Sequence, residues 1–296
     1  MQVKHVPTKC KTLLHSFRKR FLPYNWGINP YRGCEHSCPY CFARYTHEYL
    51  EHNAEKDFEN LIYVKTNSPA VLEKELEANK NKGEVVAIGT VCDPYQPAEK
   101  EFKITRQILE IFEKHKSPVM VSTKSDLILR DLDILSKMVP EKNILVNITL
   151  TSLNDEITKK IEPRAALGTR RLEVVRQLSA AGIPVNILFM PIFPYLTDSP
   201  QDLDNIIREL ARAGAQDMVC GILGMHKSAR KSIWSLIRNE FPELAPKYAQ
   251  LYKNRDLREA RSRKIYRTIW VARSKYGLTF HVSLPSNHEK EIPTLF

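Results

Sequence analysis

The chain has 296 residues, of which 43% are hydrophobic, and its 45 Lys and Arg against 34 Asp and Glu give a formal net charge of +11. This length and composition suffice to bury the core of one large domain, and no apolar stretch approaches the 18 residues of a membrane span. Since no N-terminal apolar run with a cleavage site occurs either, we expect a cytoplasmic protein. The positive charge favours polyanionic partners such as nucleic acid, although many cytoplasmic proteins share it.

Residues 1–24 form a basic lead-in with two prolines and no clear period. We expect this lead-in to pack across the base of the main domain or near the cysteine-rich loop that follows it. Cys10 lies here outside any ligand spacing, so we interpret it as a packed or surface thiol.

From residue 28 onward, short apolar runs alternate with longer runs of helical period, which is typical of βα units around a parallel sheet. We expect strands near residues 28–32, 85–91, 118–122, 144–150, 184–190 and 216–220. We expect helices near residues 43–53, 68–80, 102–115, 126–138, 169–181 and 200–213. Six such units predict an α/β fold, a partial (β/α)6 barrel of the TIM type.

The loop after the first expected strand, called the cysteine loop below, contains Cys34, Cys38 and Cys41 in the pattern C-x3-C-x2-C. Three thiolates on one short loop can surround a single inorganic centre. A [4Fe–4S] cluster on three thiolates leaves one iron open, whereas a structural zinc site needs four ligands and no second cysteine pair follows. Other interpretations stay open: a zinc site completed by His36 or His47, a disulfide plus a spare thiol, or three small core residues.

With Tyr40 before the last cysteine, the loop reads C-x3-C-x-aromatic-C, which resembles the signature of the radical S-adenosylmethionine (SAM) superfamily. The strings NPYRGC, YCFAR, GTVCDPYQPAE and IEPRA resemble the branch that includes spore photoproduct lyase, often called DNA repair photolyase-like. This resemblance spans about residues 25–220. It implies a [4Fe–4S] cluster whose open iron binds SAM, reductive cleavage of SAM to a 5′-deoxyadenosyl radical, and an electron donor such as flavodoxin or ferredoxin.

In barrels of parallel strands the functional groups gather at the carboxyl ends of the strands. The cysteine loop follows the first expected strand, Asp93 the second, and Thr123 and Lys124 the third, while Thr149 and Met190 end the fourth and fifth. We therefore expect these groups on one face.

On that face the resemblance implies contacts to SAM. Asp93 would accept hydrogen bonds from the ribose hydroxyls, although an Asp-Pro pair also opens turns. Lys124 and Arg164 are candidate partners of the methionine carboxylate, and Glu162 would orient Arg164 or bind the SAM amino group. A solvated charge beside a helix is the alternative for each. The superfamily's GGE string is absent, and Gly89 stands near its place. The expected SAM-binding residues are Tyr40, Asp93, Thr123, Lys124, Thr149, Glu162, Arg164 and Met190.

Two further cysteines are candidate catalytic hydrogen donors, because spore photoproduct lyases use a cysteine thiol in this way. Cys92 immediately precedes Asp93, but its offset does not match the lyase pattern, and Cys220 lies near the end of the sixth expected strand. Both also fit ordinary core positions.

The C-terminal quarter is rich in arginine interleaved with Tyr and Trp, and residues 247–275 favour a helix. Such a surface suits nucleic acid, and an amphipathic helix covering the barrel with Ile265, Ile269 and Trp270 inward is the alternative. We expect the tail, residues 284–296, to return toward the barrel.

The sequence therefore predicts a radical SAM enzyme with a lead-in (1–24), a partial barrel (25–222) and a helical extension (223–296). By resemblance its substrate is DNA or RNA, with repair of a damaged base as one possibility. The alternatives are a radical SAM enzyme acting on a peptide or small molecule, a non-catalytic zinc-binding nucleic-acid module, and an enzyme that works only with a partner protein.

Overall fold

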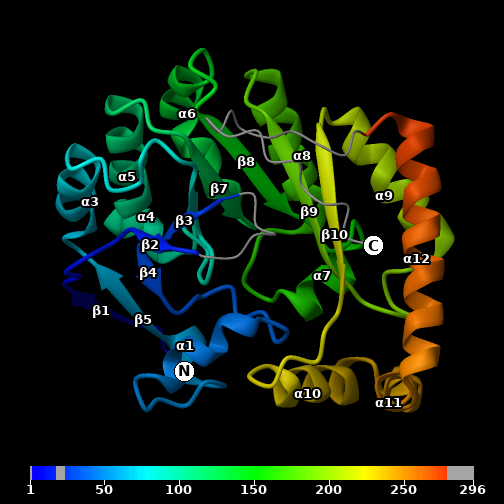
Figure 1. The fold of residues 1–296 in the computed structure, drawn as a ribbon. Helices are drawn as coiled ribbons and strands as arrows, with labels where there is room; N and C mark the ends of the chain where they lie inside the picture. The colour runs from blue at the N-terminus through cyan, green and yellow to red at the C-terminus, as the bar shows by residue number, and fades with distance from the viewer. Residues whose placement is uncertain (1, 18–23, 279–296) are drawn as a thin grey trace.

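The computed structural model describes residues 2–17 and 24–278, and it is built on a seven-stranded sheet (Figure 1). The strand order is β10-β9-β8-β7-β6-β3-β2. These strands are β2 (His15–Ser16), β3 (Trp26–Ile28), β6 (Val86–Ile88), β7 (Val119–Thr123), β8 (Ile144–Thr149), β9 (Val185–Ile192) and β10 (Asp217–Ile222). All pairs from β3 to β10 are parallel and β2 is antiparallel at the edge, so the expected partial barrel is confirmed and stays open between β2 and β10 in the described chain.

A second, three-stranded sheet has the order β1-β5-β4, formed by β1 (Lys4–Thr8), β5 (Leu61–Lys65) and β4 (Tyr31–Arg32). The expected strand at 28–32 was wrong as a single element, because β3 and β4 belong to different sheets. Neither β1 nor β5 was expected. Pro7 lies in β1 at the edge of this sheet, where its missing N–H costs no ladder hydrogen bond.

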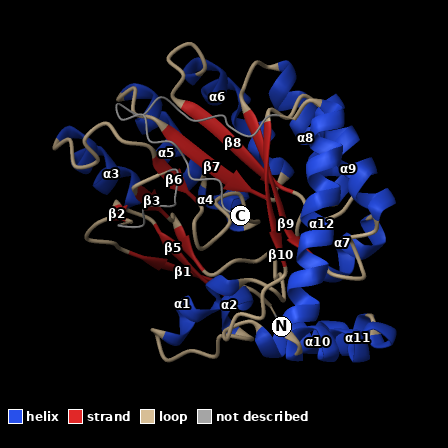
Figure 2. Cartoon of the chain, turned by 45° about the vertical axis from the view of Figure 1, so that its right-hand side comes forward, coloured by secondary structure: helices blue, strands red, loops and turns tan. Residues whose placement is uncertain are grey.

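Longer helices flank the main sheet on its outer side (Figure 2). They are α3 (Ser68–Glu77), α5 (Ile104–Lys114), α6 (Leu132–Met138), α8 (Gly168–Ala180) and α9 (Pro200–Arg212). Short helices lie in the connections: η1 (Phe42–Arg44), α1 (Tyr45–Glu48), α2 (Asp57–Asn60), α4 (Ala98–Phe102), η2 (Asp126–Asp131) and α7 (Asp155–Ile161). The expected helix at 43–53 is thus only η1 and α1, and the one at 102–115 begins after a break at Lys103, which has a left-handed φ of 51°.

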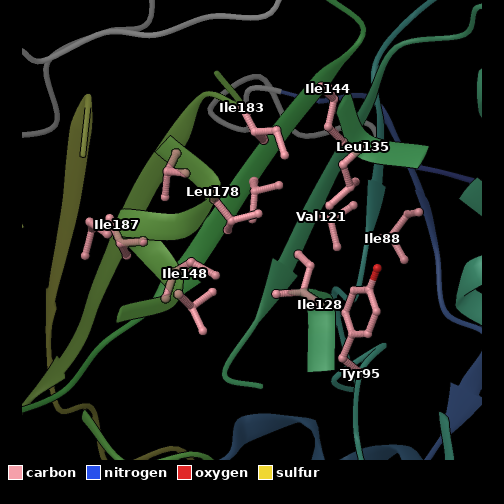
Figure 3. Packing of buried hydrophobic residues seen from close by; sticks show 14 of the residues in the cluster. Ile88, Tyr95, Val121, Ile128, Leu135, Ile144, Ile148, Leu178, Ile183 and Ile187 are labelled. Atoms are coloured by element: carbon pink, nitrogen blue, oxygen red, sulfur yellow. The ribbon is translucent and has the colours of Figure 1, made fainter. Parts of the chain in front are cut away.

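The main core lies between the sheet and these helices. Val121, Ile148 and Ile187 on the strands pack with Leu135 and Leu178 on the helices (Figure 3). Because side chains alternate along a strand, the residues between these core positions face the barrel interior. A small apolar cluster fills part of that interior: Val85, Ala87, Met120 and Leu145, with Tyr24 against it.

The C-terminal helices are α10 (Arg230–Glu240), η3 (Pro242–Leu244), α11 (Ala245–Lys253) and α12 (Arg255–Tyr276). The expected single helix is interrupted at Asn254, whose side chain accepts a hydrogen bond from Leu257 N at 3.0 Å and caps α12. No helix within the described ranges is long and apolar enough to cross a bilayer.

Helix α12 packs beside α9 along the open edge of the sheet (Figures 1 and 2). Ile265 and Ile269 are buried as expected, but the expectation for Trp270 was wrong, because its side chain is 54% exposed. Successive helical residues are turned by about 100°, so Trp270 cannot share the inward direction of Ile269. The inward position is taken by Arg273, which donates to Asp217 Oδ1 at 2.8 Å. The expected return of the tail lies outside the described residues.

Candidate functional site

The carboxyl ends of the central strands point toward the cysteine loop and α1 (Figure 1). Backbone and side-chain hydrogen bonds fix this loop: Cys34 N donates to Phe58 O at 2.9 Å, and Glu35 N donates to Gln96 Oε1 at 2.9 Å. The Glu35 carboxylate lies 3.3 Å from His5 Nε2 on β1. The lead-in therefore contacts the cysteine loop, one of the two locations expected for it.

Arg44 ties the loop to the segment that follows it. Its guanidinium, almost fully buried, donates to Cys38 O at 3.1 Å and to the Glu59 carboxylate at 2.8 Å. It also donates to Glu55 O at 2.8 Å. Arg44 thus links the middle of the cysteine loop to α2 and the residues before it. The YCFAR string therefore contains a structural arginine in addition to Cys41.

Cys34, Cys38 and Cys41 come together in a shielded environment. Cys34 and Cys41 belong to a small apolar cluster with Phe58, and Cys34 and Cys38 are buried. All six cysteines of the chain are free thiols, which rules out the disulfide interpretation in this structure. Burial raises the pKa of the Cys38 thiol to about 12, helped by nearby Glu162, and also raises the pKa of Cys34 and Cys41. Binding as thiolates therefore requires a centre that supplies positive charge.

A single metal ion and a four-iron cluster place different demands on the three cysteines. No three His, Cys, Asp or Glu side chains in the described ranges form a group that could hold one metal ion. Each thiolate of a four-iron cluster binds a different iron, so the ligands need not converge on one point. His47, one candidate fourth zinc ligand, has its Nε2 at 2.9 Å from Leu61 O. His36, the other candidate, lies with Nδ1 3.3 Å from Asp93 Oδ2.

Asp93 is held by hydrogen-bond donors from two segments. Its carboxylate accepts from Thr123 Oγ1 at 2.7 Å, from Lys124 N at 2.7 Å and from Tyr95 N at 2.9 Å. Burial alone would raise the pKa of Asp93, but the imidazole of His36 and these hydrogen bonds lower it to about 2. Asp93 therefore links the end of β7, through Thr123 and Lys124, to His36 in the cysteine loop. Its carboxylate is already hydrogen-bonded by the protein before any ligand binds.

Glu162 forms a buried polar network that the sequence did not reveal. Its carboxylate accepts from the Tyr40 hydroxyl and from Thr151 Oγ1 at 3.1 Å, and lies 2.6 Å from the guanidinium of Arg171. Arg171, fully buried on α8, also donates to Thr149 O at 3.1 Å. Burial would raise the pKa of Glu162, but Arg171 and Lys124 lower it. Arg171, and not Arg164, is the partner of Glu162.

The two candidate cations differ sharply in placement. Arg164 is exposed, and among the described residues its guanidinium donates only to Glu59 O, at 3.4 Å. Lys124 lies at the end of β7, with its ammonium 6.0 Å from the centre of the Tyr40 ring. Burial lowers the pKa of Lys124, but the neighbouring Cys38, Glu162 and Asp93 outweigh this and raise it. The Lys124 ammonium makes no hydrogen bond or ion pair within the described chain, and its contact there is with the ring of Tyr40.

Met190 lies against the backbone of β10, since a Cβ added to Gly221 would meet Met190 Cβ at 3.3 Å.

The two candidate hydrogen donors are both shielded thiols. The Sγ of Cys92 lies 3.6 Å from Asn29 Oδ1, and burial raises the pKa of Cys92 to about 12. Burial also raises the pKa of Cys220 to about 12, although Arg273 opposes it. Cys220 shares the strand face of Met218, which packs in the core under the helices. The structure thus brings Met190 to the interior and turns Cys220 toward the helix layer.

Sequence comparison identifies relatives. The sequence profile of the Radical SAM superfamily matches residues 28–210. An uncharacterized protein of Mycobacterium tuberculosis is 34% identical over 247 residues, which cover 82% of this chain and 72% of that protein. An uncharacterized protein of Methanocaldococcus jannaschii is 32% identical over 171 residues, 58% of this chain and 61% of that protein.

Solved structures with the same fold include spore photoproduct lyase. One lyase mutant superposes with a TM-score of 0.66 at 16% identity, covering 92% of this chain and 79% of the lyase chain. A lyase mutant with bound AdoMet and dinucleoside spore photoproduct superposes with a TM-score of 0.62 at 16% identity, covering 80% of this chain and 66% of that chain. Streptococcus suis SuiB bound to the precursor peptide SuiA gives a TM-score of 0.51 at 17% identity, covering 76% and 45%. At these identities the likeness shows the fold.

Proposed function

The chain belongs to the radical SAM superfamily, and from this premise we propose that Cys34, Cys38 and Cys41 hold a [4Fe–4S] cluster used with SAM to oxidise a bound substrate by hydrogen abstraction. The observation that carries the proposal is a set of three shielded free thiols, one of which, Cys38, lies near the ammonium of Lys124. When bound, such a cluster supplies the electron that cleaves SAM to a 5′-deoxyadenosyl radical. A small reduced carrier of the flavodoxin or ferredoxin type would deliver that electron, and such chemistry fits a reducing cytoplasm.

The residues around the cysteine loop suggest how SAM is oriented. Lys124 is the proposed partner of the methionine carboxylate, because its ammonium is shielded and otherwise unpaired. Tyr40, held by its hydroxyl on Glu162, offers a ring face for the adenine, and the backbone at Met190 would line the same pocket. Asp93 and Thr123 keep the cysteine loop fixed to β7 and remain candidates for a ribose contact. Thr149 supports Arg171 through its carbonyl. The hydrogen-donor roles of Cys92 and Cys220 stay predictions.

The proposed substrate is nucleic acid. The net charge of +11 attracts a polyanion, and the outward face of α12 carries Lys264, Arg267 and the half-exposed Trp270. Phe42 directly follows the last cysteine and is 45% exposed, and Tyr49, which is 76% exposed, packs against Tyr45, whose ring stacks on Phe42. Exposed aromatic rings among cations suit the stacking of unpaired bases. A lyase of this fold binds a dinucleoside lesion, which supports the same substrate class.

The SAM contacts are tested by a matched pair of variants. Lys124→Met removes the unpaired ammonium, and Arg164→Met removes an exposed guanidinium of equal charge. We expect reconstituted Lys124→Met to keep its iron and to bind SAM about 10- to 100-fold more weakly, the worth of one charge-assisted hydrogen bond. Arg164→Met should bind SAM within about twofold of the parent. The opposite order would assign the carboxylate to Arg164.

The substrate class is tested by 5′-deoxyadenosine release from the reduced, reconstituted chain with SAM. Single-stranded DNA or RNA should stimulate the release, and its affinity should fall steeply with salt. Because SuiB with the same fold binds a precursor peptide, peptide is the alternative. Stimulation by peptides alone would overturn the nucleic-acid proposal and leave the SAM chemistry in place.

A further inference from the structure

Three polar side chains on neighbouring strands form a row in the barrel interior, close to the carboxyl ends of β7 and β8. Ser122 on β7 is in register with Asn147 on β8, and Asn147 is in register with Asn186 on β9. Neighbouring strands lie about 4.8 Å apart, so the three side chains stand next to one another. The Asn147 amide donates to Ser122 Oγ at 3.2 Å, which shows that these two point to the same face.

The row faces the interior and not the helices. Val146, Ile148 and Ile187, the neighbours of the two asparagines in sequence, belong to the core beneath the helices, so the alternating asparagines point the other way. Leu145 and Met120, two residues before Asn147 and Ser122, belong to the apolar cluster inside the barrel. The polar row therefore lies between the apolar cluster inside the barrel and the carboxyl ends of the strands.

The space above the row opens to solvent. Leu188 and Met190 follow Asn186 on the same face of β9 and are both partly exposed. Val219 of β10, in register with Leu188, is 50% exposed. A molecule that enters from the carboxyl ends of the strands would pass these residues and reach the asparagines.

Asn186 carries the strongest indication of a ligand. Its side chain is only 7% exposed, and its Oδ1 is buried with no hydrogen-bond partner in the described chain. Leaving a buried acceptor unpaired costs stability, and an apolar residue of similar size would avoid that cost. A buried, unpaired acceptor on the face of β9 that also carries the partly exposed Leu188 and Met190 can accept a hydrogen bond from a ligand that enters the barrel.

The chemistry of the row selects the ligand class. A free acceptor disfavours phosphate and carboxylate groups, which offer no N–H. A carboxamide presents an acceptor and a donor side by side, and this fork matches the edge of a nucleobase. Resting on the nucleic-acid substrate proposed above, we propose that Asn186, with Asn147 and Ser122, binds the hydrogen-bonding edge of an unpaired base inserted into the barrel. The base, and not the phosphate backbone, is then what the interior recognises.

The experiment compares the parent, Asn186→Leu and Asn186→Ala, each with reconstituted cluster and SAM, and uses Asn239→Leu on the exposed face of α10 as the matched control. The probes are fluorescent single-stranded homo-oligonucleotides of each base and an abasic oligomer of the same length, at one fixed salt concentration. We expect the parent to bind at least one base-bearing oligomer about tenfold more tightly than the abasic one, and both Asn186 variants to lose that preference. Asn239→Leu should keep it.

Thermal unfolding gives the second readout. Asn186→Leu should melt at the same temperature as the parent or higher, because it removes an unpaired buried acceptor. A clear fall in melting temperature would show that the amide has a structural partner and would overturn the inference. Equal binding of abasic and base-bearing oligomers by the parent, or an unchanged preference in both Asn186 variants, would overturn it too. Failure of the parent to bind any oligonucleotide would refute the nucleic-acid substrate as well.

Discussion

Substitution of Arg171 by methionine tests whether the buried network around Glu162 holds the cysteine loop. The guanidinium is fully buried, lies 2.6 Å from Glu162, and donates to Thr149 O at 3.1 Å and to Ala166 O at 2.7 Å. Arg171→Met leaves the carboxylate of Glu162, 1% exposed, without its cation. Breaking a buried pair in this way costs about 3–5 kcal/mol of unfolding free energy. In a chain of this size the melting temperature should fall by roughly 6–10 °C.

The assay is thermal and urea unfolding of Arg171→Met beside two comparison variants. Arg170→Met removes the adjacent arginine, whose pair with Asp126 at 2.9 Å lies at the surface, and should cost less than about 1 kcal/mol. The double variant Arg171→Met with Glu162→Gln removes both charges and should recover most of the loss. A loss below about 1 kcal/mol for Arg171→Met, or no recovery in the double variant, would refute the reasoning.

The same variant has a consequence for the cysteine loop. The Glu162 carboxylate accepts a hydrogen bond from the hydroxyl of Tyr40, and Tyr40 lies between Cys38 and Cys41 in the sequence. A displaced carboxylate should therefore loosen the cysteine loop. Iron content after anaerobic reconstitution should therefore fall in Arg171→Met. It should recover in the double variant only if the amide that Glu162→Gln introduces still accepts from Tyr40. Arg170→Met should take up iron like the parent. Full iron uptake by Arg171→Met would separate the network from the cluster site.

Three further predictions concern the ligands, the pH dependence and one glycine. Cys38→Ala should abolish cluster assembly and 5′-deoxyadenosine formation, measured by iron content and chromatography. Folding lowers the pKa of Asp93 from 3.8 to about 2, so the ionised carboxylate contributes about 2 kcal/mol of stability above pH 3.8. This contribution is lost as the pH falls toward 2. Asp93→Asn should therefore remove this acid dependence from the unfolding midpoint. A Cβ at Gly168 would lie 1.9 Å from Ser152 O, so Gly168→Ala should lower the melting temperature by several degrees even though alanine favours helices, with roughly 1–3 kcal/mol lost.

The parallel sheet was predictable because its evidence is local. The runs around Val121, Ile148 and Ile187 are each long enough to identify a buried strand, and regular alternation with helices dictates a parallel arrangement. The second sheet was missed for the opposite reason. The run Leu61–Lys65 has strand composition, but its partner, Lys4–Thr8, lies more than fifty residues earlier and contains a proline. Only the folded chain shows that these two short segments pair.

The cysteine loop was found from spacing, whereas Arg171 was missed although a signal existed. Arg171 precedes Val174, Val175 and Leu178 by three, four and seven residues, so it occupies the apolar stripe of α8. An arginine in a buried stripe calls for an acidic partner, which Glu162 provides from the preceding loop. The IEPRA string directed attention to Arg164 because it stands closer in sequence, but the chain turns it outward.

Several residues of the family-like strings bind one another and so stabilise the fold. Glu99, fully buried, lies 2.7 Å from Arg130 and accepts the Tyr31 hydroxyl, so the NPYRGC and GTVCDPYQPAE strings bind each other. Asp93 is likewise occupied by Thr123 and by the backbone of Lys124. Such pairing explains why a motif can be specific for a family and still be uninformative about a substrate.

Binding capacity therefore resides in the polar atoms that the fold leaves unpaired. In the described part of the chain, the Lys124 ammonium and the Asn186 Oδ1 make no hydrogen bond to the protein, and they differ in kind, one being a charged donor near the cysteines and the other a neutral acceptor in the barrel. Their residue types gave no sign of this, because lysines and asparagines are usually solvated. If the ammonium binds the carboxylate of SAM, the acceptor is left for the substrate, and within the proposed nucleic-acid class a base offers the N–H that the phosphate lacks.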